Sequence, residues 1–306
     1  MMAHRLPSLA ALALLVVMGS ALGCAPRAAR LPVMADPPSA WAVMRRDSCA
    51  PPARPAILAK GSLYYTRVVP ARRTNRTQFS IWGDFDGPMR LDVAAGIGTS
   101  LAHIREDGDG LTIFYPEQKT AYTHADPVLG ATRLGMPFPF SLALLARVCA
   151  GDFAGLMPET FELGAPEGAG FTYVVDHQLA RADGGTGTTG VHRIGLDRAG
   201  RPVLVEGTVA AARTDAGDAG PARRSWRLEI NTYEEGGARP PMPGRLTLAM
   251  DDGETGVLRI ASREFKVAPW PARATGLELP EDTRLYRLDN VTKPQDAGMP
   301  ATDEDK

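Results

Sequence analysis

The sequence of 306 residues contains few of the side chains that form catalytic or metal sites. It has only three cysteines and five histidines, and no two histidines have the His-x-x-x-His spacing of a helical metal site. No serine lies in a Gly-x-Ser-x-Gly motif. We therefore expect no metal, no cofactor, no catalytic residues and no enzymatic activity. A site assembled from residues far apart in the sequence stays open as the alternative.

An excess of charge and long apolar runs are also missing. The chain has 34 Lys and Arg residues against 35 Asp and Glu residues, a net charge of −1. This balance, without a long basic run, argues against a nucleic-acid partner. After the first 23 residues, no stretch is long and apolar enough to span a bilayer.

The first 23 residues have the features of a secretory signal. Arg5 precedes the apolar run Leu9–Met18, and small residues follow. The motif Ala21-Leu22-Gly23-Cys24 resembles a bacterial lipoprotein signal, in which Cys24 would be acylated, palmitate being one of the chains, and become the first residue. That resemblance, with Ala25 rather than Asp next in the chain, implies a lipid anchor in the outer membrane that faces the periplasm. The alternative is an ordinary signal peptide with a cysteine nearby.

The rest of the chain divides into three segments. Residues 24–55 are rich in Pro, Ala and Arg and predict a tether, with a short helix at Ser39–Arg46 for which Ser39 is the expected N-cap. Residues 56–288 form the predicted domain. Residues 289–306 are polar without a period and predict a disordered tail.

The domain alternates apolar and polar residues in short runs separated by turn residues, which is typical of antiparallel strands. In its first half, Phe79 and Ile81 share one face of a strand, as do Leu91 and Val93. The predicted strands are Leu58–Val68, Thr77–Gly83, Met89–Ala94, Ser100–Arg105, Leu111–Tyr115, Thr120–His124, Thr160–Leu163, Phe171–Val175, Gly190–Leu196, Pro202–Val209, Ser225–Tyr233, Arg245–Met250 and Thr255–Val267, with an edge strand expected within Leu277–Leu288.

One helix is predicted between the two sets of strands. Ser141 is its expected N-cap, and Gly151 its expected C-terminal stop. Arg147 is its only charged residue, so we expect it to be buried on most sides, across the concave face of the sheet.

Cys49 and Cys149 are the cysteines that remain once Cys24 is acylated. We predict a disulfide between them because an exposed free thiol is a liability in an oxidising compartment, where disulfides persist. The alternative is two separate thiols, with Cys149 buried as a small apolar side chain and Cys49 exposed.

The order of these features resembles the LolA/LolB-like lipoproteins, most closely the LolB-like outer-membrane group. The resemblance covers residues 57–158 and rests on five features: Gly61 in the first strand, the Phe79–Gly83 strand, Arg90–Val93 with Gly96 and Gly98, Leu134-Gly135 before Pro137, and the helix that ends at Gly151-Asp152. It implies a mainly β (α+β) fold: a curved, open antiparallel sheet, or half barrel, with a capping helix over an apolar groove.

Two functions are consistent with these features. The first is binding or transfer of lipid or lipoprotein acyl chains in the groove, and the second is a non-catalytic structural or interaction role with another envelope protein. In both, the N-terminal lipid would hold the protein on the membrane. The candidate groove residues, each of which could equally be ordinary core, are Phe79, Ile81, Leu91, Val93, Ile104, Ile113, Phe138, Leu142 and Leu145.

Overall fold

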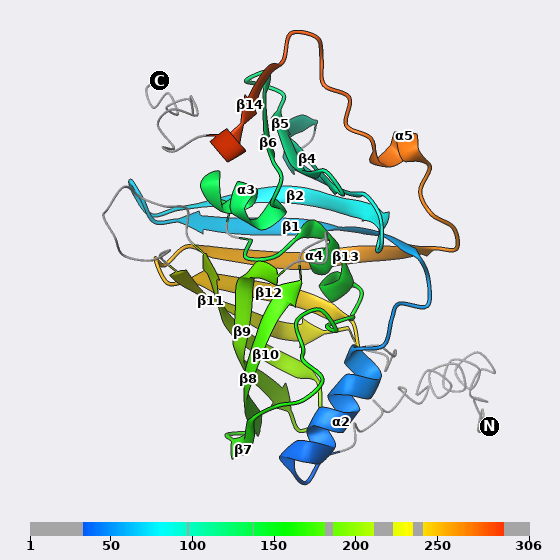
Figure 1. The fold of residues 1–306 in the computed structure, drawn as a ribbon, viewed down its shortest axis with the longest axis vertical. Coiled ribbons are helices and arrows are strands. Elements are labelled where there is room, and N and C mark those ends of the chain that lie inside the picture. Colours follow the sequence, from blue (N-terminus) through cyan, green and yellow to red (C-terminus); the bar gives the residue numbers. More distant parts are fainter. Residues whose placement is uncertain are drawn as a thin grey trace, which may run out of the picture. The chain divides into compact units, whose positions relative to one another are not determined.

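The computed structural model describes residues 33–96, 98–136, 138–180, 186–210, 223–234 and 241–290. The expected signal peptide, Cys24, the first part of the expected tether and residues 291–306 of the expected tail lie outside these ranges. The described residues form one sheet with several short helices (Figure 1).

The sheet has fourteen described strands in the order β14-β6-β5-β4-β3-β2-β1-β13-β12-β11-β10-β9-β8-β7. Each pair of neighbours is antiparallel, except β14, which runs parallel to β6. The strands are β1 (Ala56–Arg67), β2 (Arg73–Asp84), β3 (Met89–Ala95), β4 (Thr99–Asp107), β5 (Gly110–Tyr115), β6 (Thr120–His124), β7 (Leu163–Glu167), β8 (Gly170–Ala180), β9 (Thr186–Asp197), β10 (Pro202–Ala210), β11 (Arg223–Tyr233), β12 (Pro243–Met250), β13 (Thr255–Lys266) and β14 (Arg284–Arg287).

The chain builds this sheet as two meanders, because short connections favour antiparallel neighbours. Strands β1–β6 form one meander and β7–β13 the other, and the pairing of β1 with β13 joins them. At this junction the register shifts between Lys60 and Gly61. A Cβ atom on residue 61 would collide with the carbonyl oxygen of Arg259 on β13, so the close approach of the two strands requires glycine there.

Apolar side chains cross each meander in register and face the same side of the sheet. In the first meander the row is Ala59, Ile81, Leu91, Ile104 and Ile113. In the second meander it is Tyr173, Ile194, Val205, Leu228 and Leu248. All ten residues belong to one buried cluster, so the two rows together line the concave side of one continuous sheet.

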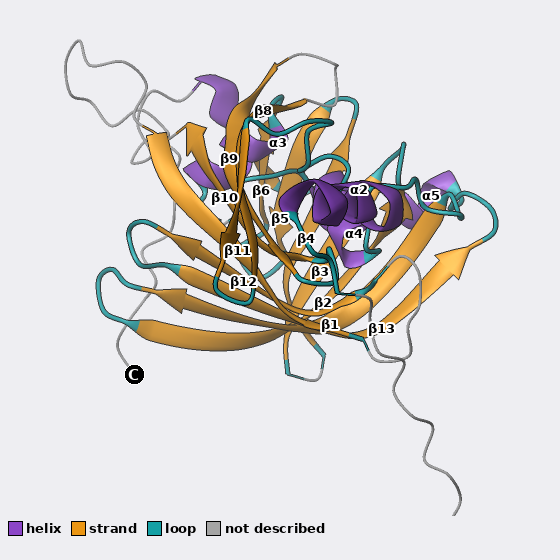
Figure 2. Cartoon of the chain, turned by 90° about the horizontal axis from the view of Figure 1, so that it is seen from below, coloured by secondary structure: helices purple, strands orange, loops and turns teal. Residues whose placement is uncertain are grey.

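The described sheet is strongly curved and open, with β7 and β14 as its edges (Figure 2). Helices α2 (Pro37–Ser48) and α4 (Leu142–Cys149) lie inside the curve. The predicted fold class, a curved open antiparallel sheet with a capping helix, is therefore confirmed.

Helix α2 includes the short helix predicted at Ser39–Arg46 and corrects the prediction that this part of residues 24–55 is a tether. Its residues Ala40, Trp41 and Met44 are buried in the core cluster, and the helix contacts β7, β8 and β9. A tether would keep such side chains in water, whereas here the apolar face of the helix gains from burial. The N-cap is Asp36 rather than Ser39, because the Asp36 carboxylate accepts hydrogen bonds from the Ser39 N–H and hydroxyl.

Most strands agree with the prediction in place, and two regions differ. The strand expected at Thr160–Leu163 begins at Leu163, as β7. Helix α3 (Pro127–Arg133) was not predicted, although Asp126 caps it and Pro127 opens it in the usual way. The expected edge strand is β14, and the expected tail is ordered at its start, where Leu288–Asn290 form a short 3-10 helix with Leu288 buried.

Residues 268–283 form a strap that carries the chain from β13 to β14 and includes helix α5 (Ala272–Thr275). Three side chains of the first meander bind backbone carbonyl groups of this strap. The Trp82 indole donates to Ala274 O at 2.9 Å, Arg105 Nε donates to Thr275 O at 3.1 Å, and Arg90 donates to Gly276 O. Arg90 and Leu91 are adjacent strand residues, so the strap lies on the convex face, opposite the apolar row.

Candidate functional site

The candidate site is the concave face of the first meander together with the helix that covers it. The structure brings all nine predicted groove residues into the core cluster. Eight of them are at most 9 % exposed, and Val93 is partly buried against the others. The residues therefore share one apolar space, and in this structure the helices and neighbouring side chains fill it.

Helix α4 is the predicted covering helix, and it contacts β1, β2 and β3. Leu142, Leu145, Ala146, Val148 and Cys149 point into the core. Ser141 is the N-cap, as predicted: its hydroxyl oxygen accepts a hydrogen bond from Leu144 N at 3.1 Å. At the other end, the backbone of Gly151 is left-handed, with φ +83°, which is typical of a helix stop.

The N-terminal end of α4 is bound by an acidic side chain from the sheet. Glu106 on β4 accepts hydrogen bonds from Leu142 N at 2.6 Å and Ala143 N at 3.4 Å. Together with the Ser141 contacts to Leu144 N and Leu145 N, these bonds satisfy the first four backbone N–H groups of the helix.

The C-terminal end of α4 is bound by basic side chains. Arg263 on β13, whose side chain is 4 % exposed, donates from Nε to Cys149 O at 2.6 Å and also binds Glu234 and the carbonyl of Pro243. Within the helix, Arg147 binds the buried Asp152 at 2.9 Å and Asp86 at 2.6 Å. The helix thus has an acid at its positive end and bases at its negative end, so polar contacts fix both ends while the middle packs apolar side chains.

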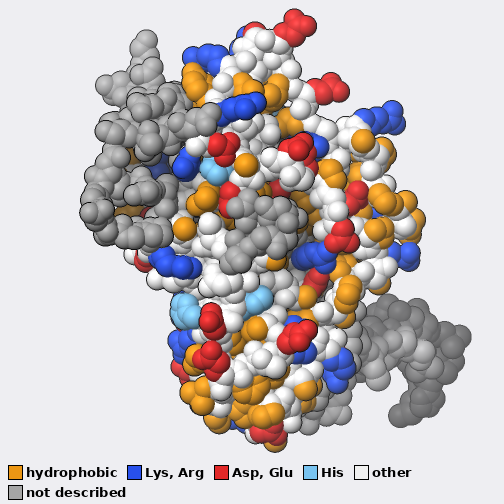
Figure 3. All heavy atoms as spheres, viewed as in Figure 1, with side chains coloured by type: hydrophobic (Ala, Val, Ile, Leu, Met, Phe, Trp, Pro, Cys, Tyr) orange, Lys and Arg blue, Asp and Glu red, His pale blue; other side chains and the backbone are white. Residues whose placement is uncertain are grey.

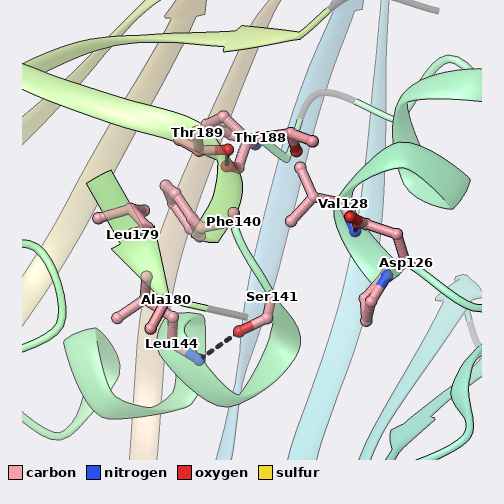
Figure 4. A pocket seen from close by; sticks show the side chains of 12 residues that line it. Asp126, Val128, Phe140, Ser141, Leu144, Leu179, Ala180, Thr188 and Thr189 are labelled. Atoms are coloured by element: carbon pink, nitrogen blue, oxygen red, sulfur yellow. Dashed lines mark hydrogen bonds between the residues drawn. The ribbon is translucent and has the colours of Figure 1, made fainter. Parts of the chain in front are cut away.

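A small pocket lies beside the N-terminal end of α4, between α3 and the strands β8 and β9 (Figure 4). Its lining includes Val128 of α3, Phe140, Leu144 of α4, Leu179 of β8 and Thr188 of β9. Its volume is about 40 Å³, far below the roughly 300–1,000 Å³ of pockets that enclose drug-sized ligands. This pocket is therefore too small for an acyl chain.

The two cysteines do not form the predicted disulfide, because both Cys49 and Cys149 are free thiols. The Cys49 sulfur turns back to its own helix and lies 3.4 Å from Met44 Sδ, whereas Cys149 is fully buried in α4. A backbone hydrogen bond from Phe153 N to Ser48 O, at 2.7 Å, joins the two regions instead. The alternative of two separate thiols therefore describes this structure.

The convex face carries a polar row that sequence spacing did not reveal. His103 Nε2 lies 3.0 Å from Ser100 Oγ, and His103 Nδ1 lies 2.9 Å from Asp92 Oδ1. Ser100 and His103 are three apart, which places them on opposite faces of a regular strand, but a register shift between Val93 and Ala94 brings them together.

This row has the order of a Ser–His–Asp triad without its geometry. The His103 Nδ1 contact with Asp92 lacks the alignment of a hydrogen bond, and Arg90 already binds the Asp92 carboxylate at 2.9 Å. A triad requires the acid to orient the histidine through a directed bond. We therefore interpret the row as part of the polar network of the convex face.

Charges of both signs are interspersed on the face of the molecule seen in Figure 3. Among the described residues, no group of three or more His, Cys, Asp or Glu side chains is placed to hold a metal ion. Within the same residues, no helix has the length and apolar character needed to cross a membrane.

Comparison with known proteins identifies the fold. No protein-family model and no curated protein matches the sequence, whereas 35 chains of solved structures match. A LolA superfamily protein from Nitrosomonas europaea is 12 % identical, with a TM-score of 0.51, over 79 % of this chain and 98 % of that one. A DUF1329 family protein from Desulfovibrio piger is 9 % identical, with a TM-score of 0.47, over 78 % and 97 %. At these identities the likeness concerns the fold alone, and the fold is LolA/LolB-like, as the sequence motifs indicated.

Proposed function

We propose that this protein is a membrane-anchored, periplasm-facing lipoprotein that binds or transfers lipid or lipoprotein acyl chains on its concave face. Cys24 carries the anchoring lipid and places the protein at the outer membrane. The binding step requires no catalytic residue and no cofactor, because helix α4 moves aside and the acyl chain takes its place.

The observation that supports this proposal is how the apolar face of the sheet is covered. In a sandwich, a second sheet would close this face permanently. Here the short helix α4 covers the first meander, and its ends are fixed by polar contacts to Glu106, Arg263 and Asp86. Such contacts can be exchanged for water, whereas an acyl chain that replaces the helix gains about 0.8 kcal/mol per buried CH₂ group.

The pocket beside Ser141 and Leu144 indicates where an acyl chain would begin to enter. It lies between α3, the N-terminal end of α4 and the strands β8 and β9. Lifting that end of α4 would extend the pocket along Leu142 and Leu145 towards the apolar row of β2–β5.

The experiment begins with the full chain expressed in bacteria, with and without Cys24→Ser. The substituted protein should leave the membrane fraction, because its anchor is lost. Native mass spectrometry of this soluble form should then detect co-purified lipid, and an apolar fluorescent dye should bind it. Adding Leu142→Glu should weaken dye binding, because a charged side chain then enters the apolar space. Leu285→Glu, at a position 53 % exposed on β14, is the matched control and should leave binding unchanged.

The second candidate function is a structural or interaction role, and the dense packing of the concave face favours it. If neither lipid nor dye binds the soluble form under any of these conditions, the acyl-chain proposal fails and the second candidate replaces it. If the Cys24→Ser protein stays in the membrane fraction with unchanged mobility, the lipid anchor is wrong.

A further inference from the structure

Glu106 is a buried acid on the apolar side of the sheet. The residue is 5 % exposed, and its neighbours in register on β3 and β5 are Met89 and Leu111. It follows Ile104 by two residues and therefore faces the same side as the apolar row of the first meander. An acidic side chain is rarely buried at such a position unless it has specific partners.

The partners of Glu106 belong to the covering helix. Leu142 N and Ala143 N both donate to its carboxyl group. These bonds are the polar contacts that join the N-terminal end of α4 to β4, directly beside the pocket. If that end of α4 leaves the sheet, Glu106 loses both donors and becomes hydrated.

We propose that Glu106 is a proton-controlled latch that holds the N-terminal end of α4 on the sheet when protonated and releases it when ionised. The proposal extends the proposed function by adding regulation to the same site, and its test needs no lipid. It also predicts that α4 opens at its N-terminal end. The C-terminal end stays on the sheet because Arg263 and Arg147 hold it, and their guanidinium groups stay charged at any physiological pH.

The groups around Glu106 determine the sign of the effect. Burial is the largest influence and raises the pKa of Glu106 to about 7, and the nearby Asp107 raises it further. The N–H groups of Leu142 and Ala143 and the Ser141 hydroxyl act in the opposite direction, since they favour the charged form. Helix α4 has no acidic residue in its first turn, and the facing residues on β3 and β5 are uncharged.

Opening therefore becomes easier as the pH rises. In the open state Glu106 is hydrated, and its pKa returns towards the ordinary glutamate value of 4.5. The covered state binds the proton more tightly than the open state, so it is favoured at low pH and loses this advantage as the pH rises through about 7. Between these two pH values, the open fraction should grow by up to about tenfold per pH unit, and it should level off above pH 7.

Leu145→Cys provides the measurement, because Leu145 lies buried in the first turn of α4, at the end that opens. In the full chain that also carries Cys24→Ser, Cys49→Ser and Cys149→Ser, this substitution introduces the single thiol. Its rate of reaction with a maleimide in native protein, divided by the rate in denatured protein at the same pH, reports how often α4 opens. This ratio should rise between pH 5 and pH 7 and change little from pH 7 to pH 8.

Substitution of Glu106 separates the latch from general effects of pH. Glu106→Gln keeps a hydrogen-bond acceptor for α4 but cannot ionise, so the rise with pH should disappear. Glu281→Gln, at an exposed position before β14, is the control and should keep the wild-type profile. Amide hydrogen exchange of residues 142–145 in unsubstituted protein at pH 5 and pH 7 gives the same readout should Glu106→Gln not fold.

Two outcomes would overturn the proposal. One is that, with Glu106 unchanged, the ratio of native to denatured maleimide rates stays constant from pH 5 to pH 7. The same conclusion follows if the exchange rate of residues 142–145, corrected for the intrinsic effect of pH, stays constant over this range. The other is a Glu106→Gln variant that keeps the wild-type rise. Neither outcome bears on whether lipid binds, which the native mass spectra decide independently.

Discussion

At the scale of single residues, burial decides the chemistry of the cysteines. Burial raises the pKa of Cys149 to about 12 and that of Cys49 to about 11. Thiolates, rather than thiols, attack disulfides and alkylating reagents, so both side chains are poorly reactive in the folded protein. The reason that favoured a disulfide in the sequence, an exposed thiol in an oxidising compartment, therefore does not apply to either cysteine.

The first prediction follows from these two thiols. In the full chain with Cys24→Ser, purified without reductant, a maleimide should modify two cysteines after denaturation. In the native protein it should react slowly with Cys49 and more slowly still with Cys149, which is fully buried. Counting modified cysteines by intact-protein mass spectrometry gives the answer. A denatured chain with no reactive thiol would show that the Cys49–Cys149 bond does form.

At the scale of elements, α2 belongs to the fold because of Trp41. Its ring lies 5.2 Å from that of Phe161 and 4.8 Å from that of Tyr173, and its indole N–H donates to Glu159 O at 3.1 Å. These contacts join α2 to β8 and to the segment before β7, so the helix closes the far end of the second meander.

We therefore predict that Trp41→Ala lowers the free energy of unfolding by about 3–5 kcal/mol, the usual cost of removing a large buried aromatic side chain. Chemical denaturation followed by circular dichroism measures it. Arg46→Ala, on the same helix but with a side chain 60 % exposed, should change stability by less than about 0.5 kcal/mol. If the Trp41→Ala and wild-type proteins are equally stable, α2 does not stabilise the fold and is better described as part of a tether.

Local patterns explain why most elements were predictable. Alternation over Phe79–Trp82 and Leu91–Val93 fixes which face is buried, and Ser141 and Gly151 mark the ends of α4. The sequence also indicated a helix at Ser39–Arg46, but its burial in the core was not predicted, because the Pro, Ala and Arg content of residues 24–55 resembles that of a linker. The latch escaped prediction because Glu106 and Leu142 are 36 residues apart and meet only through the curvature of the sheet.

At the scale of the whole molecule, the strap and β14 protect an edge of the sheet. Without them, β6 would present unpaired backbone groups, which are templates for association with other chains. The parallel pairing of Arg284–Arg287 with Thr120–Thr123 covers this edge, and Trp82, Arg90 and Arg105 hold the strap that makes the crossing. No short-range pattern in the sequence could predict a parallel partner so distant along the chain.

We predict that a chain ending at Val267 is less stable than the full chain and associates in a concentration-dependent way. It loses the cover of β6 and the acceptor for the buried Arg90, a bond to a charged group worth about 1.5–3 kcal/mol. Size-exclusion chromatography and thermal denaturation provide the readouts. A chain ending at Asn290 keeps β14 and the strap and should behave as the full chain does. Monomeric, unaltered behaviour of the shorter chain would show that β14 is dispensable.

The junction between β1 and β13 also sets the timing of folding. Ala56 pairs with Lys266, so the partner of the first strand leaves the ribosome about two hundred residues later, after roughly 10–40 s of synthesis. Throughout this interval the nascent first meander has an open edge at β1, which nothing in that meander can cover. The junction can therefore form only after the chain as far as Lys266 has emerged.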